Sequence, residues 1–318
     1  MKGLTDIPGI LVGHASDYDG LTGCTAILCE AGAVAGGDIR GSATGTTDWD
    51  VLSPRHVTDR IHGVSLAGRS VFGLEAASGV RSFLEHKGVG FPFGGLRIPV
   101  VPGAIIFDFG IGKTSIRPTR EMGEAAAAAA TSKAVEEGAV GAGTGATVGK
   151  TLGLKQGMKS GLGSWTVELE GRYKGVLVSA LAVVNALGDV RDPATRKILA
   201  GARRSETSME FADGARVMMG GSPAAQRGNT TLVVVATNAQ LTKIEATKLA
   251  ELGQLGVARA IDPVNTMNDG DIVIAMSAGT ATAPVDALGV AAAQAVAESI
   301  VRAVKMAPPM GGLPGLKK

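Results

Sequence analysis

Short apolar runs alternate with Ala-rich helical segments along most of this chain, and this alternation is the strongest constraint on its fold. Apolar runs over 176–184 and 232–236 are typical of buried strands, and the second lies within a strand expected over 231–237. Residues 120–137 and 284–304 are rich in Ala, which favours helices. Aromatic residues make up only 3% of the chain, so Ala, Val, Leu and Ile must form the core, and 47 glycines allow close backbone approach.

The remaining elements follow from the same patterns. Strands over 165–170 and 176–184 are predicted to form a hairpin through 171–175. Residues 189–229 are charged and rich in Gly, Ser and Pro, which predicts a long exposed connection. Further strands are expected over 22–31, 98–109 (interrupted at Pro102 and Gly103) and 271–277, and helices over 74–86 and 241–255. This mixture fits either two sheets between helix layers or a doubly wound sheet.

Charge and hydropathy exclude several classes of partner. The net charge is +2, from 31 basic and 29 acidic residues with no concentrated basic stripe, so we expect no nucleic-acid partner. The first residues lack the apolar core of a signal peptide. The longest apolar stretches, 175–187 and 290–304, are too short or carry charge, so we expect no membrane span. A cytoplasmic protein is the expectation.

Cysteine and histidine usage indicates neither a disulfide nor a metal centre. Cys24 and Cys29 are the only cysteines, and their odd spacing places them on opposite faces of a strand. Two buried reduced thiols are therefore predicted. The four histidines lie far apart with no ligand spacing, so we expect no bound metal and no other cofactor.

The sequence Gly228-Asn229-Thr230-Thr231 directly precedes an apolar run. If the Asn229–Thr230 bond is cut, Thr230 carries a hydroxyl and a free α-amine on one Cα. Such an amine has a pKa of about 7.7–8.0 and can act as a base near neutral pH. Threonine activated by its own terminal amine is a recognised nucleophile. Taken alone, however, a loop that meets a strand is the commoner meaning of this pattern.

Three other features could carry chemistry: an acidic pair, a Gly-rich segment with a lysine, and an asparagine at the end of a strand. Asp269 and Asp271 are two residues apart before a strand, so both carboxylates point to one side, although Asp-Gly more often marks a turn. Residues 141–151 end in Gly-Lys-Thr like a phosphate loop, but their glycines are one residue out of register. What remains there is a flexible Gly-rich segment delivering Lys150, whose simplest interpretation is a solvated surface lysine.

Asn185 ends the apolar run 176–184, where its amide can donate to an oxyanion or cap a strand equally well. The Gly-flanked arginine segments 38–41 and 68–74 receive no catalytic role from chemistry alone.

Together these segments resemble the DmpA-type (Ntn-like) aminopeptidase family, which includes the nylon-oligomer hydrolases. Seven segments match in the family's order and run through most of the chain: 38–41, 66–80, 100–109, 141–150, 183–185, 228–231 and 269–271.

The resemblance implies an αββα sandwich, like that of DmpA and ornithine acetyltransferase, made as a precursor that cuts itself. Cleavage between Asn229 and Thr230 would give an α chain of residues 1–229 and a β chain of residues 230–318. The resemblance also implies that Thr230 is the nucleophile and that Asp269 and Asp271 form the family's acidic pair. Lys150 and Asn185 match the family's lysine and its asparagine on the oxyanion side. Phe107 falls in the substrate pocket where several relatives have Tyr, which removes a hydroxyl and affects substrate orientation or the oxyanion hole.

By the same resemblance, the expected activity is that of an amidohydrolase or aminopeptidase that cleaves short peptides or related amides through an acyl-enzyme on the N-terminal Thr230. Alternatives are an endo-acting hydrolase of ω-amino acid oligomers, an acyltransferase, or a scaffold that kept the fold and lost catalysis. Relatives form rings or tetramers, so a homotetramer of αβ units is expected.

Overall fold

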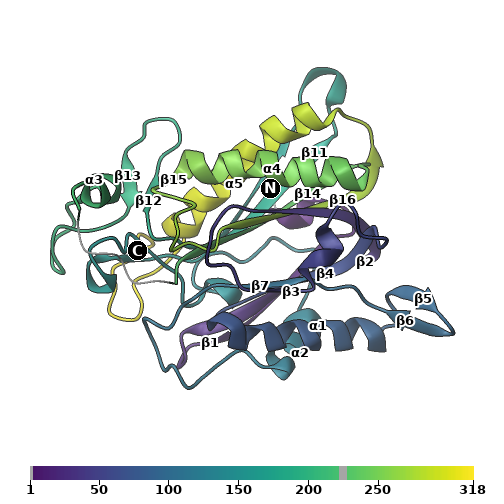
Figure 1. Ribbon diagram of the computed structural model, residues 1–318, viewed down its shortest axis with the longest axis horizontal. Helices are drawn as coiled ribbons and strands as arrows, with labels where there is room; N and C mark the ends of the chain where they lie inside the picture. The colour runs from purple at the N-terminus through teal and green to yellow at the C-terminus, as the bar shows by residue number, and fades with distance from the viewer. Residues whose placement is uncertain (1–2, 222–227) are drawn as a thin grey trace.

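The computed structural model describes residues 3–221 and 228–318. Helices α4 (Lys243–Ala260) and α5 (Val285–Lys305) cover one side of the strands, and α1 (Glu75–His86) and α2 (Arg120–Ala128) cover the other (Figure 1). The strands between them lie in two layers, so the molecule is an αββα sandwich and not a doubly wound sheet.

The main sheet runs in the order β10-β11-β14-β16-β2-β4-β7-β3, with β1 also paired to β2. The long strand β2 belongs to both layers, because residues 22–28 pair with β1 and residues 34–39 pair with β16. Its register with β4 shifts between Leu28 and Ala33. The strands are β1 Leu11–Asp17, β2 Thr22–Ile39, β3 Thr46–Thr47, β4 Arg60–Ala67, β7 Gly103–Ile105, β10 Leu162–Glu168, β11 Leu177–Asn185, β14 Thr230–Ala239 and β16 Ile272–Ala281.

Short elements complete the chain outside the main sheet. They are the pair β5 (Phe91–Phe93) and β6 (Leu96–Ile98), the pair β8 (Thr147–Val148) and β9 (Met158–Lys159), the strands β12 (Asp189–Arg191), β13 (Ile198–Ala200) and β15 (Ile261–Asp262), and helix α3 (Gly214–Met219).

Alternation along the strands fills three apolar layers. On β14, Val233 and Val235 face α4 and α5, whereas Leu232 and Val234 point into the core between the two strand layers. The first part of β2, residues 22–28, faces α1 and α2 through side chains such as Leu28. Strands buried on both faces explain why these runs read as continuously apolar.

Helix ends and contacts follow from local chemistry. At the start of α4, Thr242 and Glu245 form a reciprocal capping box. Helix α5 is long and apolar enough to cross a membrane by length and composition, but 72% of that stretch is buried inside the protein. Glycines allow α1 and α2 to touch, because a Cβ at Gly79 would lie 1.8 Å from the Arg120 carbonyl oxygen.

Most predicted elements are confirmed, with shifts at their ends. Cys24 and Cys29 are free, buried, and packed in different core layers, as their spacing predicted. The confirmed predictions are the strands over 22–31, 165–170, 176–184, 231–237 and 271–277, the 171–175 hairpin, and the helices over 74–86, 241–255 and 284–304.

Three predictions are wrong in part. The helix expected over 120–137 ends at Ala128, because the Thr131 backbone instead exchanges hydrogen bonds of 3.0 and 3.1 Å with Val12. The strand expected over 98–109 is reduced to the three residues of β7 and to Ile98, which ends β6. The expected exposed connection over 189–229 contains β12, β13 and α3, and its residues 222–227 lie outside the described part of the chain.

The glycine contact between α1 and α2 predicts a stability effect. We expect Gly79→Ala to lower the free energy of unfolding by about 1–3 kcal/mol, because the added methyl group forces the helices apart. Urea unfolding followed by circular dichroism measures this. Glu85→Ala, at an exposed position of the same helix, should change it by less than about 0.5 kcal/mol. Equal stability of the two variants would show that the helices tolerate the methyl group.

Candidate active site

Three strand ends meet at one edge of the sheet and bring distant residues together. Asn185 ends β11 and is the direct antiparallel partner of Thr230, which begins β14. Strand β16 runs parallel to β14 with Leu232 beside Ile272, so Asp271 lies near Thr231. All four polar side chains are at most 2% exposed. The pairing of these strands therefore creates a polar cluster at the edge of an apolar core.

The Asn229–Thr230 peptide is held on both sides. The Thr230 hydroxyl donates to the Asn229 carbonyl oxygen at 2.5 Å, and the same oxygen accepts from the Gly270 N–H at 2.8 Å. The Asn229 N–H donates to the Asn268 carbonyl oxygen at 3.1 Å. The hydroxyl thus lies against the carbonyl group that precedes it in the chain.

The two aspartates are held by backbone donors. Asp271 accepts from the Thr231 N–H at 2.6 Å and from the Asn265 N–H at 3.0 Å. Asp269 accepts from the Thr266 hydroxyl at 2.6 Å and from the Leu187 N–H at 3.3 Å. Burial raises the pKa of both carboxyls, and repulsion from Asp269 helps to bring the pKa of Asp271 to about 7.

Lys150 fixes the orientation of the Asn185 amide. Its ammonium donates to the Asn185 side-chain and main-chain oxygens, both at 3.0 Å. The Thr147 N–H donates to the same side-chain oxygen at 3.1 Å. The amide nitrogen of Asn185 consequently points the other way and donates to the Phe107 carbonyl oxygen at 3.0 Å. This orientation presents an N–H donor toward Phe107.

Burial lowers the pKa of Lys150 to about 7, although the negative charges of Asp269, Asp108 and Asp271 oppose the shift. A lysine with this pKa exchanges protons readily near neutral pH. The interpretation of Lys150 as a solvated surface residue is wrong, since the side chain is buried. The surrounding segment 141–150 is also buried throughout, which corrects the expectation of a flexible segment.

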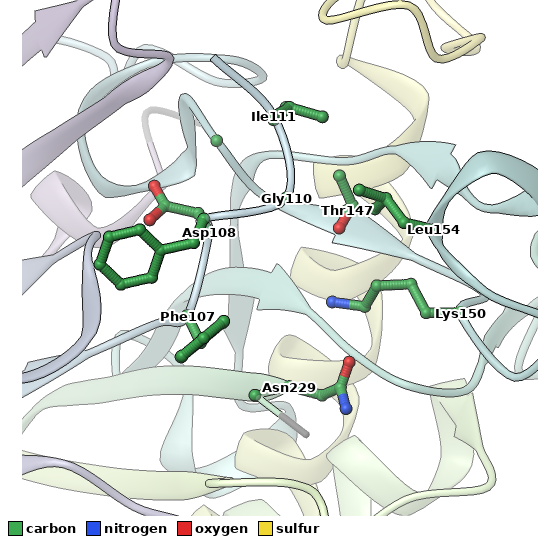
Figure 2. A pocket seen from close by; sticks show the side chains of 11 residues that line it. Phe107, Asp108, Gly110, Ile111, Thr147, Lys150, Leu154 and Asn229 are labelled. Carbon is green, nitrogen blue, oxygen red and sulfur yellow. The ribbon is translucent and has the colours of Figure 1, made fainter. Parts of the chain in front are cut away.

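A cavity of about 170 Å³ opens beside this cluster. Figure 2 shows Lys150 facing into it, with Phe107 across from it and Asn229 below. Phe107 is 37% exposed and packs edge-on against Phe109 at 5.1 Å between ring centroids. With Leu154, these rings give the cavity a largely apolar wall that suits an aliphatic chain.

Two buried cations that sequence reasoning left without a role support the cavity. Arg69 donates to the Asp108 main-chain oxygen at 2.6 Å, while the Asp108 carboxylate accepts from the Arg69 N–H at 2.6 Å. This carboxylate is turned away from Lys150 (Figure 2). Lys159 donates to the carbonyl oxygens of Gly143 and Ala146, which holds the Gly-rich segment in place. Burial lowers the pKa of Lys159 to about 7.

The segment around Gly41 holds the main chain of the two aspartates in place. The N–H groups of Arg40 and Gly41 donate to the Asp271 carbonyl oxygen at 3.0 and 3.1 Å, and the Ala43 N–H donates to that of Asp269 at 2.8 Å. A Cβ at Gly41 would lie 2.3 Å from the Asp271 nitrogen. Glycine at position 41 is the sequence signal for this close approach, but its partner is not visible in the sequence.

Within residues 3–221 and 228–318, no three potential His, Cys, Asp or Glu ligands gather into a metal-binding group. Every sequence-predicted site residue lies at or beside the cluster described above: Phe107, Lys150, Asn185, Asn229, Thr230, Asp269 and Asp271.

Comparison with known proteins places the chain in a group of hydrolases. The profile of peptidase family S58 matches residues 2–317. An uncharacterised aminopeptidase of Mycobacterium tuberculosis is 35% identical over 99% of this chain and 96% of its own length. A 6-aminohexanoate-oligomer endohydrolase of Kocuria sp. is 28% identical over 94% of this chain and 85% of its own.

The fold is also found among solved structures. The L-aminopeptidase D-Ala-esterase/amidase of Ochrobactrum anthropi, described as a variant of the Ntn hydrolase fold, superposes with a TM-score of 0.71. The match covers 98% of this chain and 88% of that one at 19% identity. The sandwich expected from the sequence is therefore the fold of Ntn-hydrolase aminopeptidases.

The buried lysines predict how stability varies with pH. The folded chain holds Lys150 with a pKa of about 7, whereas the unfolded chain restores its ordinary value near 10.4. Between pH 7.5 and 8.5 the unfolded chain therefore binds more protons, and this lysine makes stability rise with pH by up to about 1.4 kcal/mol per unit. Lys150→Met should remove that contribution.

Urea unfolding of uncut protein at several pH values measures the difference in slope, with Thr230→Ala as the common background. Lys155→Met is the control, because this lysine side chain is 83% exposed and should leave the slope unchanged. A Lys150→Met slope equal to that of the control would mean that Lys150 keeps an ordinary pKa in the folded protein.

Proposed function

Because the chain belongs to peptidase family S58, we propose that it is a self-processing amide hydrolase with Thr230 as its nucleophile. The observation that supports this most is the placement of the Thr230 hydroxyl 2.5 Å from the Asn229 carbonyl oxygen. It lies within a buried cluster that also contains Lys150 and two carboxyls of raised pKa. Ionisable groups with shifted pKa values that lie beside a cavity are typical of an active site.

Activation begins in the uncut chain. The Thr230 hydroxyl attacks the Asn229 carbonyl carbon, the acyl group moves from nitrogen to oxygen, and water cleaves the resulting ester. The products are an α chain ending at Asn229 and a β chain beginning with Thr230. The new α-amine has an ordinary pKa of about 7.7–8.0, so it can take the proton from the hydroxyl in later cycles.

In the mature enzyme, Thr230 attacks a substrate amide held in the cavity. Asp269 and Asp271 orient the new amine and balance its charge. Asn185 donates an N–H to the tetrahedral oxyanion, and Lys150 keeps that amide turned toward Phe107. Water then hydrolyses the acyl-enzyme. No step requires a cofactor.

Short peptides or related amides are the proposed substrates, with aminopeptidase activity as the first candidate. An endo-acting hydrolase of ω-amino acid oligomers is the second, because the apolar cavity wall of Phe107, Phe109 and Leu154 suits an aliphatic chain. Aminoacyl p-nitroanilides and aminohexanoate oligomers, tested on enzyme of confirmed processing, separate the two. Product formation with hydroxylamine reports transfer of the acyl group to an amine.

The assembly and location of the enzyme are proposed by resemblance. We propose a homotetramer of αβ units acting on small molecules in the cytoplasm, with neither nucleic acid nor membrane as a partner. Light scattering of the purified protein tests the tetramer.

The proposed role of Thr230 as the nucleophile predicts the outcome of a processing experiment. Thr230→Ala should abolish both cleavage and activity, because no other group replaces the attacking hydroxyl. Thr230→Ser should retain both, since it keeps the hydroxyl. Intact-mass measurement distinguishes the full chain from the two pieces. An Ala variant that still cuts itself unaided, or a wild-type chain that is active at full length, would exclude this mechanism.

The proposed role of Asn185 as an oxyanion donor predicts that its loss slows turnover. Asn185→Leu removes the amide donor at similar volume and should lower kcat on the order of 10²–10³-fold with a smaller change in KM. Rates are divided by the amount of β chain present, so that incomplete processing does not enter.

Asn238→Leu serves as the matched control for Asn185→Leu. The oxygen and the nitrogen of the Asn238 amide also form hydrogen bonds with backbone groups, but this residue lies at the opposite end of β14. Its kcat should stay within a few-fold of wild type. Equal losses in both variants would assign the Asn185 effect to sheet stability.

A further inference from the structure

We propose that the backbone N–H of Gly270 is the oxyanion donor for self-cleavage, separate from the role of Asn185 in substrate turnover. The inference rests on the proposed function, because it assigns a group to the reaction at the Asn229–Thr230 bond. A glycine between Asp269 and Asp271 lets this N–H approach without placing a Cβ against the Thr230 hydroxyl.

The reacting groups are already in contact. The Thr230 hydroxyl oxygen lies 2.5 Å from the Asn229 carbonyl oxygen, and a C=O bond is about 1.23 Å long, so the hydroxyl oxygen lies within about 3.7 Å of the carbonyl carbon. This upper bound lies about 0.2 Å above the near-attack separation of about 3–3.5 Å, so a small shift at most brings the two atoms into that range. Both residues are at most 2% exposed, so bulk water does not compete.

The chemistry places a negative charge on the Asn229 oxygen. A bond forms between the Thr230 hydroxyl oxygen and the Asn229 carbonyl carbon, and the C–N bond then breaks. The hydroxyl proton ends on the departing nitrogen, which becomes the α-amine. Between these events the carbonyl oxygen is an oxyanion, and its stabilisation controls the rate.

Of the two hydrogen bonds described for that oxygen, the one from Gly270 survives the attack. The hydroxyl loses its proton as it attacks, so its own hydrogen bond to the oxygen disappears when the charge is largest. The Gly270 N–H stays in place at 2.8 Å, and its bond becomes charge-assisted. The Asn185 amide nitrogen instead donates to the Phe107 carbonyl oxygen.

The Gly270 donor is preorganised by its neighbours. The carbonyl oxygens on either side of it, from Asp269 and Asp271, accept from the N–H groups of Ala43 and Gly41. The Asn229 N–H is in turn anchored on the Asn268 carbonyl oxygen. A donor fixed in this way does not have to reorganise when the charge forms.

A side chain at position 270 would disturb the attack. A Cβ there would lie 2.9 Å from the Thr230 hydroxyl oxygen and 2.7 Å from the Ala43 carbonyl oxygen. Both contacts are tighter than a real Cβ allows, so either the nucleophile or residues 269–271 must shift. The glycine is therefore required for close approach and not for turn formation alone.

The direct test removes the N–H without adding atoms. Glycolic acid in place of Gly270, introduced during cell-free translation of the full chain, exchanges the N–H for an ester oxygen. We expect cleavage at 229/230 to slow on the order of 10²–10³-fold, measured by intact mass over time. Gly270→Ala made by ordinary expression should also slow it.

Glycolic acid in place of Gly138 is the matched control. The buried Gly138 N–H donates to the Leu162 carbonyl oxygen at 2.7 Å across another isolated β-bridge, away from Thr230. This variant loses a comparable hydrogen bond and should cleave at a rate within a few-fold of wild type. Circular dichroism melting of both esters shows whether they lose similar stability.

Cleavage of the Gly270 ester within a few-fold of the wild-type rate would overturn the assignment while leaving self-processing by Thr230 intact. Equal slowing in both esters would also overturn it, because a general loss of stability would then account for the effect. A wild-type chain that stays at full length would overturn the proposed function and this inference together.

Discussion

Three backbone N–H groups hold the chain around Thr230 against residues 268–271, and the rest of the site is arranged around that contact. The N–H of Asn229 binds the Asn268 carbonyl, that of Gly270 binds the Asn229 carbonyl, and that of Thr231 binds the Asp271 carboxylate. The Asn229–Thr230 bond is thus clamped on both sides. Two of these bonds join main-chain groups and the third ends on the Asp271 side chain, and all three lie where the paired strands β14 and β16 begin, so the sheet itself positions the reacting atoms.

Burial gives the site its chemical character. Lys150, Asp269 and Asp271 are all removed from water, which lowers the pKa of the lysine to about 7 and raises the pKa of both carboxyls, that of Asp271 to about 7. Burying such charges costs free energy unless hydrogen bonds compensate. Here backbone N–H groups and the Thr266 hydroxyl donate hydrogen bonds to the aspartates, and the oxygens of Asn185 accept hydrogen bonds from the lysine. The same network that offsets burial also fixes the direction of each side chain.

Sequence patterns predicted the helices and strands that are stabilised locally or by strong apolar periodicity, such as α5 and β14. They failed where a tertiary contact overrides propensity. Thr131 leaves the Ala-rich helix because its backbone pairs with Val12, and residues 141–150 are ordered by packing despite their glycines. The supporting residues Arg69, Lys159 and Gly41 were missed for the same reason, since their partners lie far away in sequence.

The sequence by itself determined which side chains are available: a threonine at the start of an apolar strand, two aspartates around a glycine, a lysine in a Gly-rich stretch and an asparagine at a strand end. Family resemblance connected them, because each pattern alone has a commoner, structural meaning. Only the tertiary structure decided that they meet, that the lysine is buried, and that the glycine between the aspartates touches the carbonyl preceding Thr230. The physical reason is that strand order and burial depend on contacts between distant segments, whereas local patterns record only what each segment buries.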